Sequence, residues 1–262
     1  MKLLKKIFNL NYRILITNYL SKFETYSIIK IGNEKLFFYV PNNLIRWRVK
    51  TFFTKEPETL KWIDSFNEND IFWDVGANIG LYSLYAAKKK IKVISFEPST
   101  NNTRILARNI SKNNFYEEIF IFPIALNDIE NKFLIMNESN NVEGSAHNSF
   151  GENLDFEGKN FNPKSKYSIF GTTIDKIIND NILDVPDHIK IDVDGFEHLI
   201  LNGAKKVLQC KKLKTILVEI NENYKDHFEQ VLDILKSNNF NILAKNHLGG
   251  KYYNYIFKND NN

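Results

Sequence analysis

A turn with two glycines and an acidic residue follows a strand-like run, at the start of a long region in which strand-like and helix-like runs alternate. In the sequence DVGANIG, residues 74–80, Asp74 stands before Gly76 and Gly80, with Asn78 between the glycines. Glycine turns that join a strand to a helix bind phosphates, dinucleotides or the amino-acid end of S-adenosylmethionine. The residue types therefore indicate a small-molecule site, and the details of the turn must decide which ligand it fits.

The spacing of the turn favours S-adenosylmethionine over the other two ligands. Dinucleotide enzymes use Gly-x-Gly-x-x-Gly to expose backbone to a pyrophosphate, whereas Ala77 fills the intermediate place here. The carboxylate of Asp74 would repel a pyrophosphate but attract an ammonium or sulfonium group. Glu97 ends the next predicted strand, 23 residues after Asp74, which is about the offset of an acidic ribose ligand. No Gly-Lys-Ser/Thr follows the turn, so a P-loop is excluded.

From residue 70 onward, predicted strands alternate with predicted helices, and these elements must position the residues named above. Apolar runs suited to strands are separated by amphipathic runs suited to helices, a pattern typical of an α/β fold with a mainly parallel sheet and helices on both faces. Ligands of such sheets bind beyond the carboxyl ends of the strands. We expect the last two strands to pair antiparallel. The predicted strands read IFWDV, KVISFEP, IFIFPIAL, HIKIDVDG, TILVEI, FNILA and YNYIF.

Two segments fall outside this alternation. Residues 1–69 predict a helix, a hairpin around Gly32-Asn33 and a second helix, EPETLKWIDSF. We interpret this extension as a cap or a homodimer contact, and residues 70–262 as the cofactor-binding domain. Residues 137–171 are polar and aperiodic. Because loops of that length are usually functional or disordered, we predict a lid over the substrate.

Composition bounds the partners of the protein. The 262 residues are 43% hydrophobic and 25% charged, and the net charge is +4. The basic and acidic residues are interspersed along the sequence, and the basic ones do not form a stripe. We therefore expect no nucleic-acid partner.

Cys210 is the single cysteine, which excludes an internal disulfide. The first 20 residues lack a signal-peptide pattern, and no apolar run approaches a membrane span. We expect an amphipathic helix at the start and a cytoplasmic protein.

The combined motifs resemble the FkbM family of S-adenosylmethionine-dependent methyltransferases. The resemblance covers roughly residues 56–257 and implies a class I methyltransferase fold, which is Rossmann-like with a seven-stranded sheet. It also implies O-methylation, commonly of sugar hydroxyls in polysaccharides, glycolipids or natural products. The acceptor would then be a sugar or glycan in bacterial surface-polysaccharide synthesis. The segments that carry the resemblance are FWDVGANIGLYSLYAAK, SFEPS, PIALND, TTIDKI, IKIDVDGFEHLILNGA and ILVEI.

The resemblance also implies roles for individual residues of the cofactor site. The glycine turn would line the methionine part and offer backbone N–H groups to its carboxylate, while Glu97 would accept from the ribose hydroxyls. Asp192, after the fourth strand, would face the ammonium or the substrate. The residues implied for the turn are Asp74, Gly76, Asn78 and Gly80, and those implied for the adenine are Ala125, Leu126 and Asp128.

Methyl transfer to a hydroxyl also requires a route for the proton. His147 lies in the predicted lid, and histidine is the usual base near neutral pH, so His147 is our first candidate. Asp192, Asp194 and Glu197 are the alternatives. Asp194 stands where the family usually has Glu, and the lid reads GSAHNSF where the family often has Gly-Ser-Ser.

The residues leave several alternatives open. Asp192 and Asp194, with Glu219 and Asn221, suggest a divalent metal, but we favour one aspartate on the cofactor and the other capping the next helix. A DNA amino-methylating enzyme is disfavoured because DVDG replaces its Asn/Asp-Pro-Pro-aromatic motif. The glycine spacing disfavours a dehydrogenase. A methyltransferase for a non-sugar small molecule and a non-catalytic S-adenosylmethionine-binding module remain as alternatives.

Overall fold

The computed structural model describes residues 12, 15–16, 24–153 and 159–261. Its centre is a mixed seven-stranded sheet in the order β12-β13-β11-β10-β3-β4-β5. The five strands from β11 to β5 run parallel, and β13 pairs antiparallel with both β11 and β12, which confirms the predicted closing pair. The strands are β3 (Ile71–Val75), β4 (Lys92–Phe96), β5 (Ile119–Phe122), β10 (His188–Ile191), β11 (Thr215–Asn221), β12 (Phe240–Gly249) and β13 (Tyr252–Asn259).

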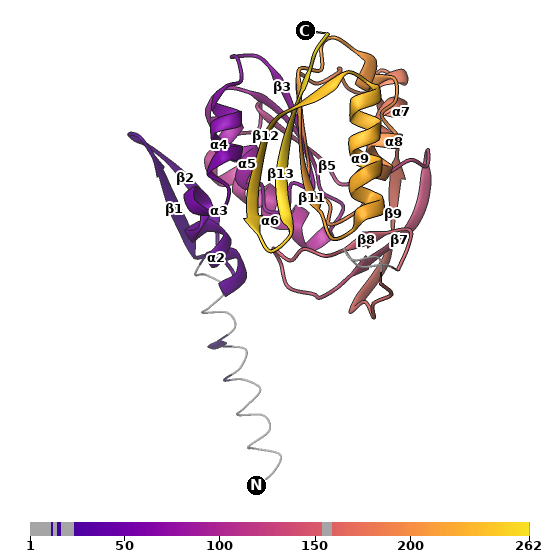
Figure 1. Cartoon of the computed structure of the whole chain (residues 1–262). Coiled ribbons are helices and arrows are strands. Elements are labelled where there is room, and N and C mark those ends of the chain that lie inside the picture. The colour runs from indigo at the N-terminus through magenta and orange to yellow at the C-terminus, as the bar shows by residue number, and fades with distance from the viewer. Residues whose placement is uncertain (1–11, 13–14, 17–23, 154–158, 262) are drawn as a thin grey trace.

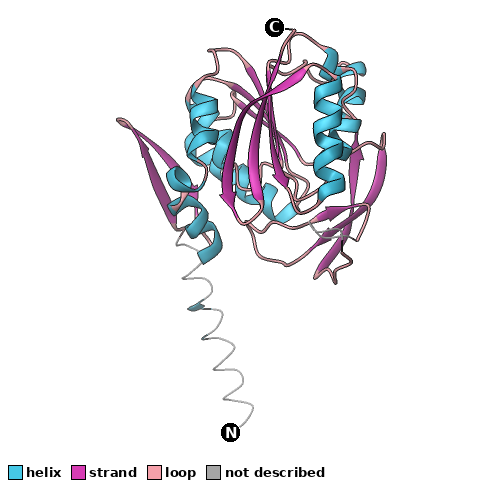
Figure 2. Cartoon of the chain, viewed as in Figure 1, coloured by secondary structure: helices cyan, strands magenta, loops and turns pink. Residues whose placement is uncertain are grey.

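Helices cover both faces of this sheet, as Figures 1 and 2 show. Side chains alternate between the faces of a strand, so Phe72 enters one apolar core and Trp73 the other. Among the described residues, no helix is long and apolar enough to cross a membrane. The first face carries α4 (Pro57–Asp64), α5 (Leu81–Lys88) and α6 (Thr100–Asn113), and the second carries α7 (Ile174–Asn179), α8 (Glu197–Asn202), η1 (Val207–Gln209) and α9 (Lys225–Ser237).

The N-terminal extension packs onto the first face. The predicted hairpin is present as β1 (Tyr26–Ile31) and β2 (Glu34–Tyr39), and the predicted helix is α4, but α2 (Asn43–Lys50) and α3 (Phe52–Lys55) were not expected. The amide of Tyr39 donates to Asn109 of α6 at 2.7 Å. One apolar core runs from Ile29 of the hairpin to Ile256 of β13, so the boundary at residue 69 does not separate two cores. The helix expected at the start lies almost entirely outside the described residues.

The segment predicted as a long loop that forms a lid is partly a second sheet. This four-stranded sheet has the order β6-β9-β7-β8. Residues 165–171 belong to β9, which pairs antiparallel with β7, so the predicted loop over 137–171 was wrong there. The reason is that β9 alternates exposed and half-buried residues over its first half, a pattern that its polar composition concealed. The strands are β6 (Ala125–Leu126), β7 (Lys132–Glu138), β8 (Ser149–Phe150) and β9 (Ser165–Thr172).

Candidate functional site

Three adjoining pockets lie where β3 and β10 end, and Gly76 lines all three. The first, which we call the apolar pocket, is lined by Phe96, Leu126 and Phe150 among others. The second, the Glu97 pocket, also contains Asn102. The third, the Lys190 pocket, is charged. The predicted glycine turn therefore lies at the junction of one continuous groove along the carboxyl edge of the sheet.

Gly76 is required by a close approach between two strand ends. Its φ is +83°, and a Cβ atom there would lie 1.9 Å from the carbonyl oxygen of Asp192. Only glycine combines that dihedral with so small a separation. Gly80 instead begins α5, and a Cβ atom there would lie 2.3 Å from Leu106 of α6. Gly80 therefore serves helix packing rather than the lining of the groove.

The backbone N–H groups of the turn are largely committed within the protein. Those of Gly76 and Ala77 both donate to the carbonyl oxygen of Phe96, at 2.9 and 3.1 Å. The N–H of Asn78 donates to Glu97 Oε2 at 2.7 Å, and that of Gly80 donates to the carbonyl of Ala77 at 2.8 Å. The N–H groups of Gly76, Ala77 and Asn78 therefore hold the turn to the end of β4, and these three donors are not available to a ligand carboxylate.

Asp74 lies beneath the turn rather than along the groove. It is buried and accepts a hydrogen bond from the hydroxyl of Ser83 at 2.5 Å, and Ser83 in turn bonds Ser95 at 2.9 Å. Burial raises the pKa of Asp74, against the opposing charge of Lys190. Asp74 does not line the three pockets. Its contacts fix the start of α5 on the sheet.

Glu97 lies where the sequence predicted an acidic ligand. Its side chain lines the middle pocket, and its two oxygens accept from the backbone N–H groups of Asn78 and Ser99, at 2.7 and 2.8 Å. Burial raises the pKa of Glu97 to about 7, although these two hydrogen bonds oppose the shift. The carboxyl group is thus rigidly oriented at the edge of the pocket.

The apolar pocket contains two of the three residues implied for the adenine. Ala125 and Leu126 line it, whereas Asp128 is exposed and does not. Asn127 lines it instead, and its side chain accepts from the backbone N–H of Asp128 at 2.6 Å. The remaining lining residues, which the sequence did not indicate, include Phe150 of β8 and Phe196. The lining is therefore mostly apolar, and the side-chain amides of Asn127 and Asn148 are its polar groups.

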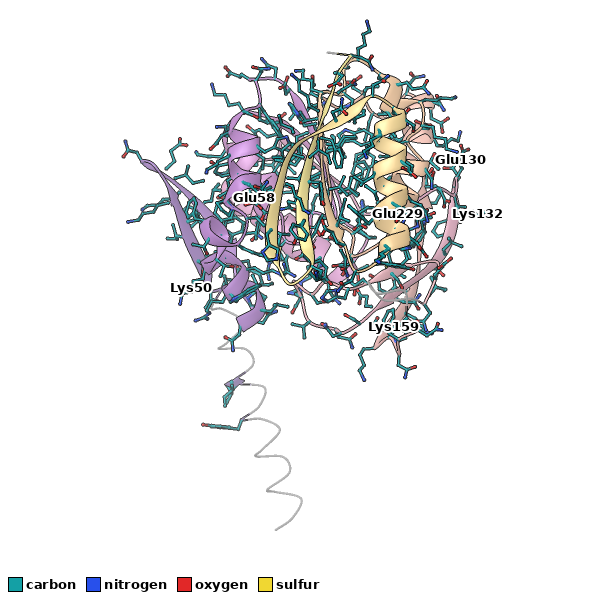
Figure 3. All side chains as sticks on the ribbon, in the orientation of Figure 1. Lys50, Glu58, Glu130, Lys132, Lys159 and Glu229 are labelled. Atoms are coloured by element: carbon teal, nitrogen blue, oxygen red, sulfur yellow. The ribbon has the colours of Figure 1, made fainter. Side chains whose placement is uncertain are left out.

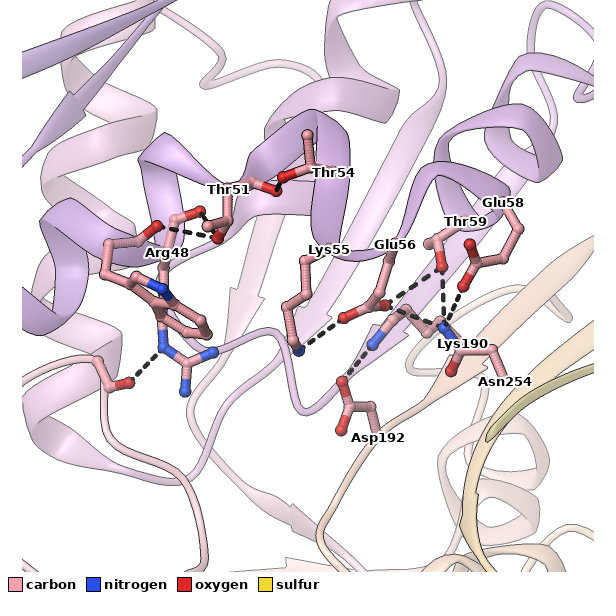
Figure 4. Close-up of polar contacts among 12 residues, drawn as sticks. Arg48, Thr51, Thr54, Lys55, Glu56, Glu58, Thr59, Lys190, Asp192 and Asn254 are labelled. Carbon is pink, nitrogen blue, oxygen red and sulfur yellow. Dashed lines mark hydrogen bonds and ion pairs between the residues drawn. The ribbon is translucent and has the colours of Figure 1, made fainter. Parts of the chain in front are cut away.

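The Lys190 pocket contains a buried network of opposite charges (Figure 4). Lys190 is 1% exposed and donates to Asp192 Oδ2 at 2.7 Å, with Glu56 of the extension nearby. Burial alone would raise the pKa of Asp192 and of Glu56, but the charges of Lys190 and Lys55 outweigh it and lower both pKa values. Burial lowers the pKa of Lys190, but the negative charges of Asp192 and Glu56 raise it by more. The pKa of Lys190 is therefore raised overall. Asp192 is therefore held as a carboxylate at the strand end.

A loop of residues 139–148, which we call the strap, crosses over the Glu97 pocket. The carbonyl of Ser145 accepts from the side-chain amides of Asn78 and Asn102, at 3.0 and 3.1 Å. From the other side, Arg48 Nε of α2 donates to the carbonyl of Gly144 at 2.7 Å. Ser145 also lines the Glu97 pocket. The strap is therefore fastened to both the turn and the extension.

Two of the candidate catalytic residues, His147 of the strap and Asp194, are in contact. The backbone N–H of His147 donates to Asp194 Oδ2 at 2.6 Å, and His147 Nδ1 lies 3.5 Å from Asp194 Oδ1. Burial raises the pKa of Asp194, and the imidazole opposes that shift. Glu197 is different, because its carboxyl accepts from the N–H groups of Val193 and Gly195 and does not line these pockets. Its position indicates a role in holding the loop before α8.

His147 also lines a wider, fourth pocket, which we call the open pocket. Lys55 lines both the open pocket and the Lys190 pocket, so the two adjoin. Glu219, at the end of β11, contributes a carboxyl whose pKa is raised well above its usual value by burial and by the charges of Asp192 and Glu56. No three His, Cys, Asp or Glu side chains of the described chain come together as a metal site. The lining is completed by Asn221, Asn223, Leu248, Gly249, Gly250, Lys251 and Tyr252.

Comparison with known proteins identifies the family. The model of the methyltransferase FkbM domain matches residues 74–242, which is more than half of the chain. The chain belongs to the FkbM methyltransferase family. A hexuronic acid methyltransferase, AglP, of Haloferax volcanii is 22% identical over 174 residues, spanning 66% of this chain and 65% of that protein.

The fold of the family agrees with the architecture described above. The crystal structure of an FkbM methyltransferase from Methylobacillus flagellatus superposes with a TM-score of 0.51 at 19% identity, covering 74% of this chain and 44% of the other. The FkbM segment of this chain begins at Asp74. Arg48, Lys55 and Glu56, which line or flank the Lys190 pocket, therefore lie outside it, and they are site residues that the sequence did not indicate.

The close approach of Gly76 to the backbone of Asp192 predicts that adding a methyl group at Gly76 strongly destabilises the fold. Gly76→Ala should lower the free energy of unfolding by more than about 2 kcal/mol, because strain at positive φ adds to a clash with backbone. Gly32→Ala is the matched control, since Gly32 also has positive φ but its Cβ would meet nothing within 4 Å. Urea unfolding should show about 1 kcal/mol for Gly32→Ala. Equal losses in the two variants would contradict the close approach at Gly76.

Proposed function

We propose that this protein is an S-adenosylmethionine-dependent O-methyltransferase whose acceptor is a sugar hydroxyl, and that it acts in the synthesis of a bacterial surface polysaccharide. Membership of the FkbM family supports methyl transfer. The relative that is named a hexuronic acid methyltransferase supports a sugar acceptor. The observation that carries the proposal is an open pocket, lined by several hydrogen-bonding side chains, that adjoins the charged end of the groove through Lys55.

The residues of the groove fit this cofactor. The apolar pocket suits the adenine, and the oriented carboxyl of Glu97 suits two ribose hydroxyls. Asp192 lines both the Glu97 pocket and the Lys190 pocket, and its neighbour Lys190 keeps it ionised. An ionised carboxylate at that point suits the ammonium of the methionine part. Groove and cofactor thus agree in the order of apolar, hydroxyl-binding and charged sections.

His147 and Asp194 supply the route for the acceptor's proton. S-adenosylmethionine, when bound, supplies a methyl group on a positively charged sulfur, so that a C–S bond breaks as a C–O bond forms. The carboxyl of Asp194 faces Nδ1 of His147, which favours the tautomer with its proton on Nδ1. Nε2 is then the ring atom that takes the hydroxyl proton. This arrangement makes His147 the base and Asp194 the residue that orients it.

The open pocket has the chemistry of a carbohydrate site. Side-chain amides from Asn221 and Asn223, the ring of Tyr252 and the ammonium groups of Lys55 and Lys251 line it. Amides and charged groups hydrogen-bond sugar hydroxyls, and an aromatic ring packs against the apolar face of a sugar ring. Its position beside the groove suits an acceptor that must meet the methyl group.

Transfer of label tests the function directly. The full-length protein is incubated with S-adenosylmethionine labelled in the methyl group, together with a panel of nucleotide sugars and surface glycans. We expect label in an alkali-stable methyl ether of a sugar, and much less with Glu97→Ala at a limiting concentration of S-adenosylmethionine. Label that is found only in non-sugar small molecules, or cofactor binding without any turnover, would contradict the proposal.

Loss of His147 should separate turnover from cofactor binding. His147→Ala should lower kcat by about 10²-fold or more, as loss of a general base usually does, with little change in the affinity for S-adenosylhomocysteine. Asp194→Asn should lower kcat and shift its pH profile. Val142→Ala is the control, since Val142 is an exposed residue of the same strap that lines none of these pockets. Turnover near the wild-type value across pH 6 to 9 in His147→Ala would assign His147 to the surface.

The raised pKa of Glu97 predicts pH-dependent cofactor binding. Below about pH 7 the carboxyl becomes protonated, so one acceptor for the ribose hydroxyls is lost and binding weakens. Affinity for S-adenosylhomocysteine should rise by up to about tenfold between pH 6 and 8, since one pKa unit corresponds to about 1.4 kcal/mol. Glu97→Gln should remove this rise, and Glu97→Ala should weaken binding by about 1.5–3 kcal/mol. Calorimetry that finds equal pH profiles in Glu97→Gln and wild type would overturn the assignment.

A further inference from the structure

The methionine part of the proposed cofactor is a zwitterion, and its carboxylate needs a donor. In many nucleotide sites the backbone N–H groups of a glycine turn supply such donors. Here the N–H groups of Gly76, Ala77 and Asn78 already bond Phe96 and Glu97. These three donors therefore cannot bind a carboxylate without losing contacts that hold the turn to the end of β4, and a basic side chain of the Lys190 pocket can bind it instead.

Three basic side chains line this pocket, and two of them are committed. Lys190 bonds Asp192 at 2.7 Å. Lys55 bonds Glu56 at 2.8 Å. Both ammonium groups therefore neutralise carboxylates of the protein itself, and drawing either one away would leave a buried acidic group without its partner, which is costly.

The third basic side chain, Arg48, has donors that are not used. Its Nε atom donates to the carbonyl of Gly144 and so fixes the plane of the guanidinium. Among the residues that the structure describes, the two terminal nitrogens of Arg48 make no hydrogen bond. The guanidinium lies within electrostatic reach of Asp192 and Asp194. Figure 4 shows it entering the site from α2, on the side opposite to Lys190.

We infer that Arg48, in the N-terminal extension, binds the carboxylate of the methionine part of the cofactor. A planar guanidinium with two parallel donors matches a carboxylate, and Asp192 across the pocket matches the ammonium. The inference rests on the proposed function, because it assumes that S-adenosylmethionine is the ligand. It also makes α2 part of the cofactor site, although α2 precedes the segment that the family model matches.

The inference is tested with two ligands that differ only in this carboxylate, S-adenosylmethionine and decarboxylated S-adenosylmethionine. Calorimetry on the full-length wild-type protein should show tighter binding of the first. Arg48→Gln should weaken S-adenosylmethionine binding by about 10- to 100-fold, the range for a hydrogen bond to a charged group. It should leave binding of the decarboxylated ligand nearly unchanged, so that the preference disappears.

Two control variants separate this role from others. Lys50→Gln changes an exposed residue of the same helix that points away from the fold (Figure 3) and should alter neither affinity. Asn42→Ser keeps a side chain that can cap α2 but removes the amide that donates to the strap at Glu143. It should leave the preference for the carboxylate intact, which shows that loosening the strap does not mimic the effect of Arg48→Gln.

The outcomes distinguish this inference from the proposed function. If wild-type protein binds S-adenosylmethionine and Arg48→Gln keeps the preference for it, Arg48 does not bind the carboxylate. If Arg48→Gln weakens both ligands equally, Arg48 acts only by holding the strap, and the inference is also overturned. Wild-type protein that binds neither ligand would overturn the proposed function, and this inference with it.

Discussion

The buried ammonium of Lys190 is the constraint around which the site is built. Lys190 is in β10, at the middle of the sheet, where water cannot solvate it. A lone buried charge costs several kcal/mol, so partners of opposite charge must be fixed beside it. One is Asp192, just beyond the end of the same strand, and the other is Glu56 of the extension. The central strand and the N-terminal extension are therefore tied together by the charge of a single side chain.

This constraint has consequences for the shape of the site. Because Glu56 must remain near Lys190, α3 and the end of α2 lie against the carboxyl edge of the sheet. Asn254 of β13 donates to Glu56 at 3.1 Å, so the C-terminal hairpin takes part in the same network. Three parts of the chain that are far apart in sequence thus form one wall of the groove, and the wall is held by charge as well as by apolar packing.

The strap bounds the groove on the other side, and its position is held by contacts with α2, which belongs to that wall. A Cβ atom at Gly144 would lie 2.6 Å from the side chain of Ile45, so the strap and α2 are in close contact. The N–H of Gly144 donates to Asn102 of α6 at 2.8 Å. A ligand in the Glu97 pocket is therefore shielded by a segment that α2 and α6 hold together. Shielding from water strengthens every charged contact inside such a site.

The sequence alone was sufficient for features that depend on local periodicity and spacing. The alternation of strand-like and helix-like runs predicted the α/β layers and the closing antiparallel pair, and the run KVISFEP predicted that Glu97 lies at the end of the second strand of the sheet. Tertiary structure decided which side chains face the groove. Asn127 replaces Asp128 there, and Glu197 turns to its own loop. Lys190 did leave a signal, as a charged residue inside the apolar run HIKI. Arg48 and Glu56 left none, because their contacts join distant segments, 96 residues apart for Arg48 and Gly144 and 198 for Glu56 and Asn254, and tertiary packing alone sets such contacts.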